Sequence, residues 1–185
     1  MAADELDDKV ARPAPGSLAS PAAVPDRSAI PPAEQRVSFQ VHRVNAKLGQ
    51  VANVLFRCHG LDLISSRILV FLLEKHEMRV GELVDLMVLP QSTISHQLQR
   101  LDKRGLIRRL RTREDNRAVA VTLTSQGLLI ARECNGLSHK VYRQMTDGLS
   151  EAEIGQLGAL LRKVFQTLDA FEGGETGGAP AGTKA

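Results

Sequence analysis

Apolar residues recur at alternating intervals of four and three residues near the start of the central region. They occupy Val37, Val41, Val44, Leu48, Val51 and Leu55. This spacing is typical of a heptad seam, so the sequence predicts a long amphipathic helix within residues 36–60.

The same pattern returns near the other end of the chain. The apolar positions there are Ile154, Leu157, Leu161, Val164, Leu168 and Phe171. Ser150 is a suitable N-cap for this helix, and Glu153 completes a capping box. A further helix is predicted over residues 125–148, with Ile130, Cys134, Leu137, Val141 and Met145 on one side.

The two narrow apolar seams of the chain must each be covered by another apolar surface. Each could pack within a monomer, as single amphipathic helices usually do. Mutual packing of both seams across a two-fold axis explains their narrowness better, and we therefore expect a homodimer. The residues expected at its interface are Val37, Val41, Val44, Leu48, Val51, Ile154, Leu157, Leu161, Val164 and Leu168.

The middle of the chain predicts a compact lobe. Residues 64–72 and 80–87 form two short helices, the second with Leu83 and Leu86 inward, and a third helix runs from Pro90 to a C-cap at Gly105. Residues 106–110 and 118–123 then read as two strands. The fold class is mainly α with a small β-hairpin wing, in the order of a winged helix-turn-helix.

Composition sets the domain boundaries. Six of the eight prolines precede residue 33, and five glycines lie within 173–182, so residues 1–35 and 172–185 are expected to be disordered tails. The remaining 36–171 fit one domain, with dimerisation helices at 36–60 and 125–171 around a lobe at 61–124. The longest aliphatic or aromatic run, 68–73, is far below the ~18 residues that a membrane span needs.

The two cysteines carry no metal-site pattern. Cys58 and Cys134 stand far apart, with no histidine or cysteine at zinc-ligand spacing. We expect both to be buried as small hydrophobic side chains, and we expect no metal or cofactor.

The predicted 90–104 helix has two chemically different faces. Ile94, Leu98 and Leu101 share one face, which should be buried. The opposite face could simply be solvated, but its donors and acceptors also suit base edges in a major groove. The candidate contacts with DNA are Gln91, Ser92, Thr93, Ser95, His96, Gln99, Arg100 and Lys103.

Positive charge around this helix favours the groove-binding interpretation. Residues 100–117 hold eight cationic and three acidic side chains, a net charge of +5, whereas the whole chain carries only +3. Such clustering favours phosphate binding. The wing candidates are Arg109, Arg111, Arg113, Asp115 and Arg117, with Arg117 the first choice for a minor groove and Asp115 its orienting partner.

The segments STISHQLQRLDKRGLIRR (92–109) and REDNRAVAVTLTSQG (113–127) resemble the MarR family of bacterial transcription regulators. Asn116 stands where the family has the middle arginine of its wing motif. The resemblance implies a homodimer that reads a pseudo-palindrome in duplex DNA. It further implies a repressor of its own or a neighbouring operon. The acidic start MAADELDD, with no apolar stretch, argues against a secretory signal, so we expect a cytoplasmic protein that is on the nucleoid when bound to DNA.

The resemblance also implies a ligand response. Many members release DNA when a small aromatic, often anionic compound binds between the dimer helices and the lobe. The candidate effector contacts are His42, Arg43, His59 and Arg67. The reactive cysteine of the family's peroxide sensors has no counterpart near the start of the first helix.

Other readings of the sequence remain open. Gln91 to His96 also resembles the ArsR family of metal-responsive repressors, although the usual thiolate pair is missing from residues 82–86. A dimeric module that binds protein through the same basic surface is a further possibility. An enzyme is disfavoured, because no motif with a nameable catalytic mechanism is present.

Overall fold

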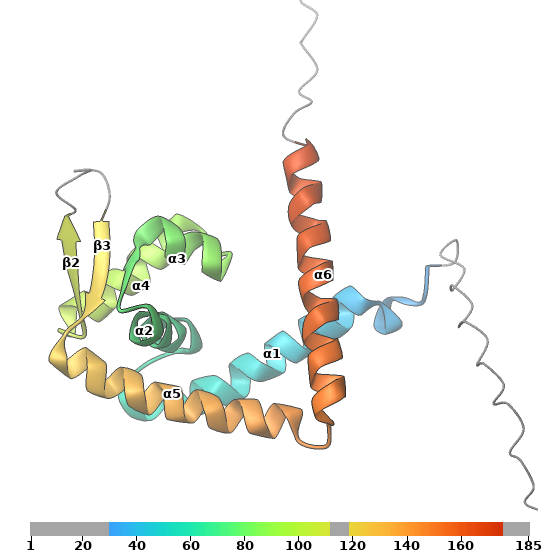
Figure 1. Ribbon diagram of the computed structural model, residues 1–185, viewed down its shortest axis with the longest axis horizontal. Helices are drawn as coiled ribbons and strands as arrows, with labels where there is room; N and C mark the ends of the chain where they lie inside the picture. The colour runs from blue at the N-terminus through green and yellow to red at the C-terminus, as the bar shows by residue number, and fades with distance from the viewer. Residues whose placement is uncertain (1–29, 112–118, 176–185) are drawn as a thin grey trace, which may run out of the picture. The chain divides into compact units, whose positions relative to one another are not determined.

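The computed structural model describes residues 30–111 and 119–175 (Figure 1). Its helices are α1 (Val37–Phe56), α2 (Leu63–Lys75), α3 (Val80–Met87), α4 (Gln91–Lys103), α5 (Ser125–Thr146) and α6 (Glu151–Glu175), with two short 3-10 helices, η1 (Ala33–Gln35) and η2 (Arg57–His59). Its strands are β1 (Glu77–Arg79), β2 (Ile107–Arg111) and β3 (Val119–Leu123). The predicted fold class is confirmed. None of the described helices is long and apolar enough to cross a membrane.

The chain divides into two compact units, residues 1–41 and 42–185. In the first, the described residues form η1 and the start of α1, where Val37 and Val41 are exposed. The second contains the remainder of α1 and all the other elements.

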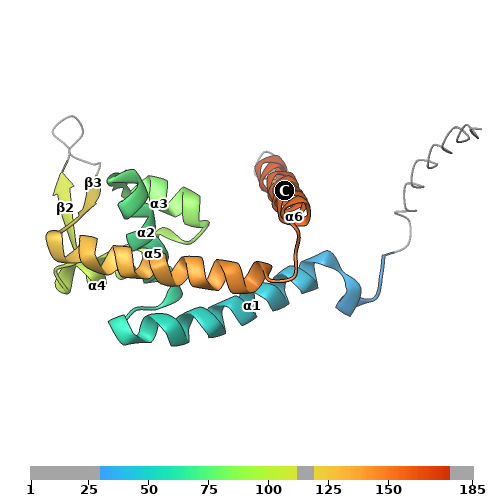
Figure 2. The same cartoon turned by 60° about the horizontal axis from the view of Figure 1, so that its bottom comes forward.

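The hydrophobic core of the second unit lies where α2 meets α4, α5 and the sheet. α5 packs against α2, and the two helices lie next to each other in both views (Figures 1 and 2). Fully buried leucines and isoleucines supply most of this core, among them Ile68, Leu72, Leu83, Leu98 and Ile107. The prediction that Leu86 also points inward is wrong, because the residue is 48% exposed at the end of α3.

The sheet has three antiparallel strands in the order β1-β3-β2. The β2–β3 hairpin was expected from the sequence, and β1 was not. β1 has three residues with one buried apolar side chain, Met78, so it offers no alternating pattern that a sequence analysis could detect. It pairs with β3 and so joins the start of α3 to the hairpin.

Left-handed residues end three of the helical segments in the same way. Gly60, Val88 and Gly105 have φ of 62°, 51° and 67°. Each is followed by an N–H that donates back to the preceding turn, as in a Schellman motif: Leu61 to Phe56, Leu89 to Val84 and Leu106 to Leu101. The left-handed conformation predicted for Gly105 is confirmed, although the C-cap residue of α4 is Arg104, one position earlier.

The predicted N-cap of α6 is also confirmed. The amide and hydroxyl of Ser150 donate to Oε2 of Glu153 at 2.8 Å and 2.7 Å, and the amide of Glu153 donates to Oγ of Ser150 at 3.3 Å. These two hydrogen bonds from Ser150 lower the pKa of the Glu153 carboxyl.

The two cysteines differ. Cys134 is fully buried, as expected, whereas Cys58 is exposed, contrary to expectation. Cys58 lies in η2, the short segment that ends α1, and its Sγ donates to the carbonyl of Leu55 at 3.1 Å.

The apolar seams of α1 and α6 are largely exposed within the single chain. The exposed fractions are 57% at Val44, 37% at Val51, 45% at Leu157, 45% at Leu161, 40% at Val164 and 61% at Leu168. Leu48 and Ile154 are half-buried. The homodimer stays a prediction at this point.

Candidate nucleic-acid interface

The two faces of α4 are placed as the periodicity predicts. Ile94, Leu98 and Leu101 are buried. Gln91, Ser92, His96, Gln99, Arg100 and Lys103 are exposed, and Thr93 and Ser95 are half-buried. The helix therefore offers solvent a strip of hydrogen-bonding side chains beside the β2–β3 hairpin, whose strand β2 packs against α4.

A buried polar network fixes α4 against α2. Gln97 is only 8% exposed and lies among the apolar residues of α4. The hydroxyl of Ser65 donates to Oε1 of Gln97 at 2.8 Å, and Nε2 of Gln97 donates to Oδ2 of Asp62 at 3.2 Å. This network was not predicted from the sequence. The spacing of Gln97, three residues after Ile94 and four before Leu101, could have marked it as inward-facing.

Asp62 is the centre of this network. It is the N-cap of α2, with Oδ1 accepting from the amide of Ser65 at 2.7 Å. Burial acts to raise the pKa of its carboxyl, but hydrogen bonds from Ser65 and Gln97 and the charge of Arg100 outweigh burial, so the pKa is lowered. Asp62 therefore stays ionised at neutral pH.

Arg100, a predicted base contact, is held by this carboxylate. Its Nη1 lies 3.2 Å from Oδ2 of Asp62 and also donates to Oε1 of Gln97 at 3.3 Å. Its side chain is still 47% exposed. Arg100 thus helps to fix α4 to the start of α2. Its contact with DNA stays a prediction.

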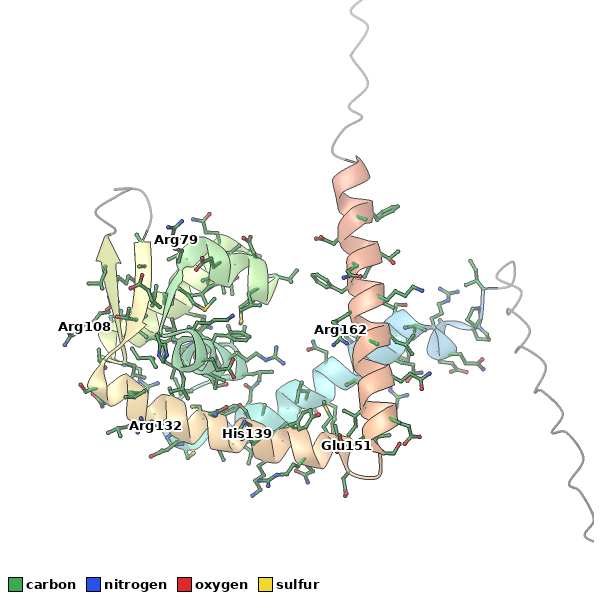
Figure 3. All side chains as sticks on the ribbon, in the orientation of Figure 1. Arg79, Arg108, Arg132, His139, Glu151 and Arg162 are labelled. Carbon is green, nitrogen blue, oxygen red and sulfur yellow. The ribbon has the colours of Figure 1, made fainter. Side chains whose placement is uncertain are left out.

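Arg109 connects the hairpin to α4. Its Nη2 donates to the backbone carbonyl of Ser95 at 3.2 Å, and its Nε lies 4.0 Å from Oδ2 of Asp102. These contacts fix strand β2 to the exposed helix. The side chain of the neighbouring Arg108 makes no hydrogen bond or ion pair with any described residue, and Figure 3 shows it pointing away from the sheet.

The remaining wing candidates cannot be placed in the same way. Arg113, Asp115 and Arg117 lie outside the described residues. Arg111 belongs to β2, but the description does not extend to its side chain.

One of the four candidate effector contacts lines a cavity. Arg67 contributes to a hollow of about 550 Å³ that also includes Asn45, Asn53, Asp62 and Leu89. It contributes to a second hollow of about 170 Å³, walled by α1, α2 and α5. Burial lowers the pKa of Arg67, which remains well above neutrality in an arginine.

The other three effector candidates line neither of these hollows. Nε2 of His59 lies 3.4 Å from Oε2 of Glu133 on α5. His42 and Arg43 are exposed on α1. Asn45, Asn53 and Asp62 were not predicted as cavity residues, because polar side chains on a helix or at its N-cap give no sign of facing a hollow.

A family model described as "MarR family" matches residues 59–118. Among curated proteins, the HTH-type transcriptional regulator MgrA of Staphylococcus aureus is 26% identical over 137 residues, covering 74% of this chain and 92% of that protein. The HTH-type transcriptional repressor IacR of Pseudomonas putida is 27% identical over 131 residues, covering 71% of this chain and 78% of that protein.

Solved structures share the fold. A mutant MarR from E.coli complexed with operator DNA is 24% identical with a TM-score of 0.63, over 69% of this chain and 91% of that one. A putative MarR family regulator from Listeria monocytogenes, complexed with 26mer DNA, is 20% identical with a TM-score of 0.71, over 80% of this chain and 99% of that one.

Proposed function

We propose that the chain is a transcriptional regulator of the MarR family and not an enzyme. It is a homodimeric, sequence-specific regulator that binds duplex DNA through α4 and the β2–β3 hairpin, a function supported by its similarity to MarR-family proteins. The observation that carries this proposal is the polar outer strip of α4. It lies opposite the buried Ile94, Leu98 and Leu101 and beside the hairpin.

The side chains of this strip suit direct readout of bases. Ser92, His96 and Gln99 are hydrogen-bonding side chains at successive turns of an exposed helix, and a B-DNA major groove is wide enough to admit a helix. Lys103 and Arg108 add positive charge that suits phosphate contacts. We propose Arg111, Arg113 and Arg117 as the wing contacts, with Asp115 orienting Arg117.

The exposed seams support the homodimer. An apolar hollow of about 350 Å³, lined by Val44, Leu48, Val51, Val141 and Met145 among others, lies between α1 and α5. In the proposed dimer, seam residues of the partner's α6, such as Leu161 and Leu168, would bury their side chains in this hollow. Each buried side chain would stabilise the dimer by roughly 1.5–3 kcal/mol. A two-fold dimer places two α4 helices on half-sites ~34 Å apart, which predicts a pseudo-palindromic operator.

We propose that the regulator represses transcription and is released by a small aromatic acid. Repression is supported by the name of the curated relative IacR, a transcriptional repressor. The smaller hollow, walled by α1, α2 and α5, supports a ligand with a negative charge, since the Arg67 guanidinium is a cation there beside apolar walls, whereas the larger hollow also holds the ionised Asp62. His42, Arg43 and His59 are weaker candidates, because none of them lines either hollow.

Selection of bound sequences from random duplexes with the purified chain tests DNA binding, and titration against salt tests its physical basis. The proposal expects an enriched pseudo-palindrome and an affinity that falls by about 0.9 in log K per log salt for each phosphate contacted. Gln99→Ala and His96→Ala should each reduce discrimination by ~1 to 3 kcal/mol at one base pair per half-site. Arg117→Ala should weaken binding to all duplexes alike.

Two results would count against this function. Absence of any enriched sequence would favour a module that binds protein through the same surface. Equal losses on specific and random DNA for all three variants would contradict the proposed division between base and phosphate contacts.

A further inference from the structure

The end of α1 leaves backbone carbonyls without partners inside the helix. α1 continues into η2 and terminates at the left-handed Gly60, where the amides of Gly60 and Leu61 donate back to Arg57 and Phe56. This motif satisfies carbonyls of the preceding turn, but those of His59 and Gly60 point out of the helix end.

Arg104 satisfies both of these carbonyls. Its Nη1 donates to the oxygen of Gly60 at 2.8 Å, and its Nη2 donates to the oxygen of His59 at 2.6 Å. The planar guanidinium presents two parallel N–H groups that match two adjacent acceptors, and its positive charge suits the negative end of a helix. Arg104 is also the C-cap residue of α4.

Three elements therefore meet at this point. α4 is tied through Arg104 to the end of α1, and η2 is tied to α5 through the contact between His59 and Glu133. α1 and α5 are the helices that line the proposed dimer hollow, and α4 carries the proposed base-reading strip. The sequence analysis counted Arg104 only as one member of the cation cluster.

We infer that Arg104 is a positioning residue that fixes the direction of α4 relative to α1 and thereby sets the spacing of half-sites that the dimer accepts. This inference rests on the proposed function. In a two-fold dimer, the axis is defined by the dimerisation helices, so the separation and rotation of the two α4 helices depend on how each α4 is held to its own α1. One additional base pair between half-sites shifts the second site by about 3.4 Å and rotates it by about 34°.

The experiment measures binding to a series of duplexes that contain the selected operator with its half-sites moved by −2 to +2 base pairs, and with +5 as the out-of-phase control. The wild type, Arg104→Met and Arg104→Lys are compared with Arg108→Met. Arg108 is the matched control, because it is an exposed arginine a few residues away with no described partner. A circular dichroism melt of each variant confirms folding.

We expect Arg104→Met to bind the selected spacing and the altered spacings with more equal affinity. The ratio of these affinities should fall by about 2- to 30-fold relative to wild type. Base discrimination within one half-site should be unchanged. Arg104→Lys, which keeps the charge but can donate along only one direction at a time, should lie between Arg104→Met and wild type. Arg108→Met should lower the affinity of all spacings by the same factor.

Two outcomes overturn the inference while leaving the proposed function intact. In one, Arg104→Met lowers affinity equally at every spacing, as a lost phosphate contact would. In the other, Arg104→Met or, if that variant does not fold, Arg104→Lys retains the wild-type spacing preference. Failure of the wild type to bind any operator would instead refute the proposed function.

Discussion

The backbone of Gly127 lies against the carbonyl oxygen of Leu106, so closely that a Cβ atom on Gly127 would be 1.7 Å from that oxygen. The same oxygen accepts a hydrogen bond from the amide of Thr124 at 3.1 Å. The side chain of Thr124 caps α5 by accepting from the amide of Gly127 at 2.9 Å. The start of α5 is thus fixed to the backbone that follows α4.

Gly127→Ala should destabilise the protein by about 3 kcal/mol, because backbone atoms rather than a flexible side chain obstruct the new methyl group. Gly136→Ala is the matched control on the same helix, since a Cβ there meets nothing within 4 Å. It should stabilise the protein by about 0.5 to 1 kcal/mol. Urea unfolding at equal protein concentrations measures both, and equal effects of the two variants would contradict the prediction.

Val88→Asn should stabilise the protein by about 1 kcal/mol. Val88 holds a left-handed conformation that is costly for a β-branched residue, while asparagine adopts it more readily. Val88 is 63% exposed, so little packing is lost. Leu86→Asn, at an exposed helical position two residues earlier, should give no gain in the same thermal melts.

Asp62→Ala should lower the free energy of unfolding by about 1 to 2 kcal/mol at pH 7, since it removes the N-cap of α2 and a partner of Gln97. The folded-state pKa of Asp62 is lowered, so the ionised carboxylate is favoured by folding. Its contribution is fully present above about pH 4 and is lost as the pH falls through the folded pKa. Asp62→Asn should retain the cap, and its deficit against wild type should vanish in acid. A deficit that stays constant with pH would show that the charge of Asp62 does not contribute.

One thiol should react with an aromatic disulfide reagent in the native protein, and two in denaturant. Cys58 is exposed, whereas burial, followed by the charges of Cys58 and Glu133, raises the pKa of Cys134 to about 11. At pH 8 only about one part in a thousand of Cys134 is thiolate. Cys58→Ser should abolish the fast reaction and Cys134→Ser should preserve it, which absorbance and peptide mapping will show.

Leu48→Asp combined with Leu161→Asp should convert the proposed dimer to monomers on a sizing column and weaken DNA binding. Both side chains belong to the apolar seams, and a buried carboxylate without a partner is costly. Gln50→Asp combined with Ala159→Asp is the control, because Gln50 lies two residues after Leu48 and Ala159 two residues before Leu161, each about 200° around its helix. A dimer that survives the first pair of changes, or dissociates equally with the second, would contradict the proposed interface.

Residue periodicity was sufficient to predict the helices and the buried face of α4. Ile94, Leu98 and Leu101 share one side of any helix that contains them, and this follows from local geometry. The strand β1 was missed because three residues with one buried side chain carry no period. Leu86 was misplaced because it lies at the end of α3, where no further turn of the core covers it.

The partners of charged residues could not be predicted in this way. Asp62 and Arg100 are 38 residues apart, and Arg104 reaches carbonyls 44 and 45 residues away. A sequence shows that arginines are clustered, but only the fold shows which of them bind the protein itself. The charge pattern alone would have assigned Arg100, Arg104 and Arg109 to phosphate contacts. In the fold, each of these arginines has a partner within the protein.

The buried Gln97 has a practical consequence for redesign. Only part of α4 is open to exchange: a library intended to redirect the protein to a new operator can vary Ser92, His96 and Gln99 freely. Gln97 should be kept constant, because each unsuitable replacement would leave the Ser65 hydroxyl without its acceptor. If Gln97 were varied, a loss of DNA binding would result from displacement of α4 and would be mistaken for a change in sequence preference.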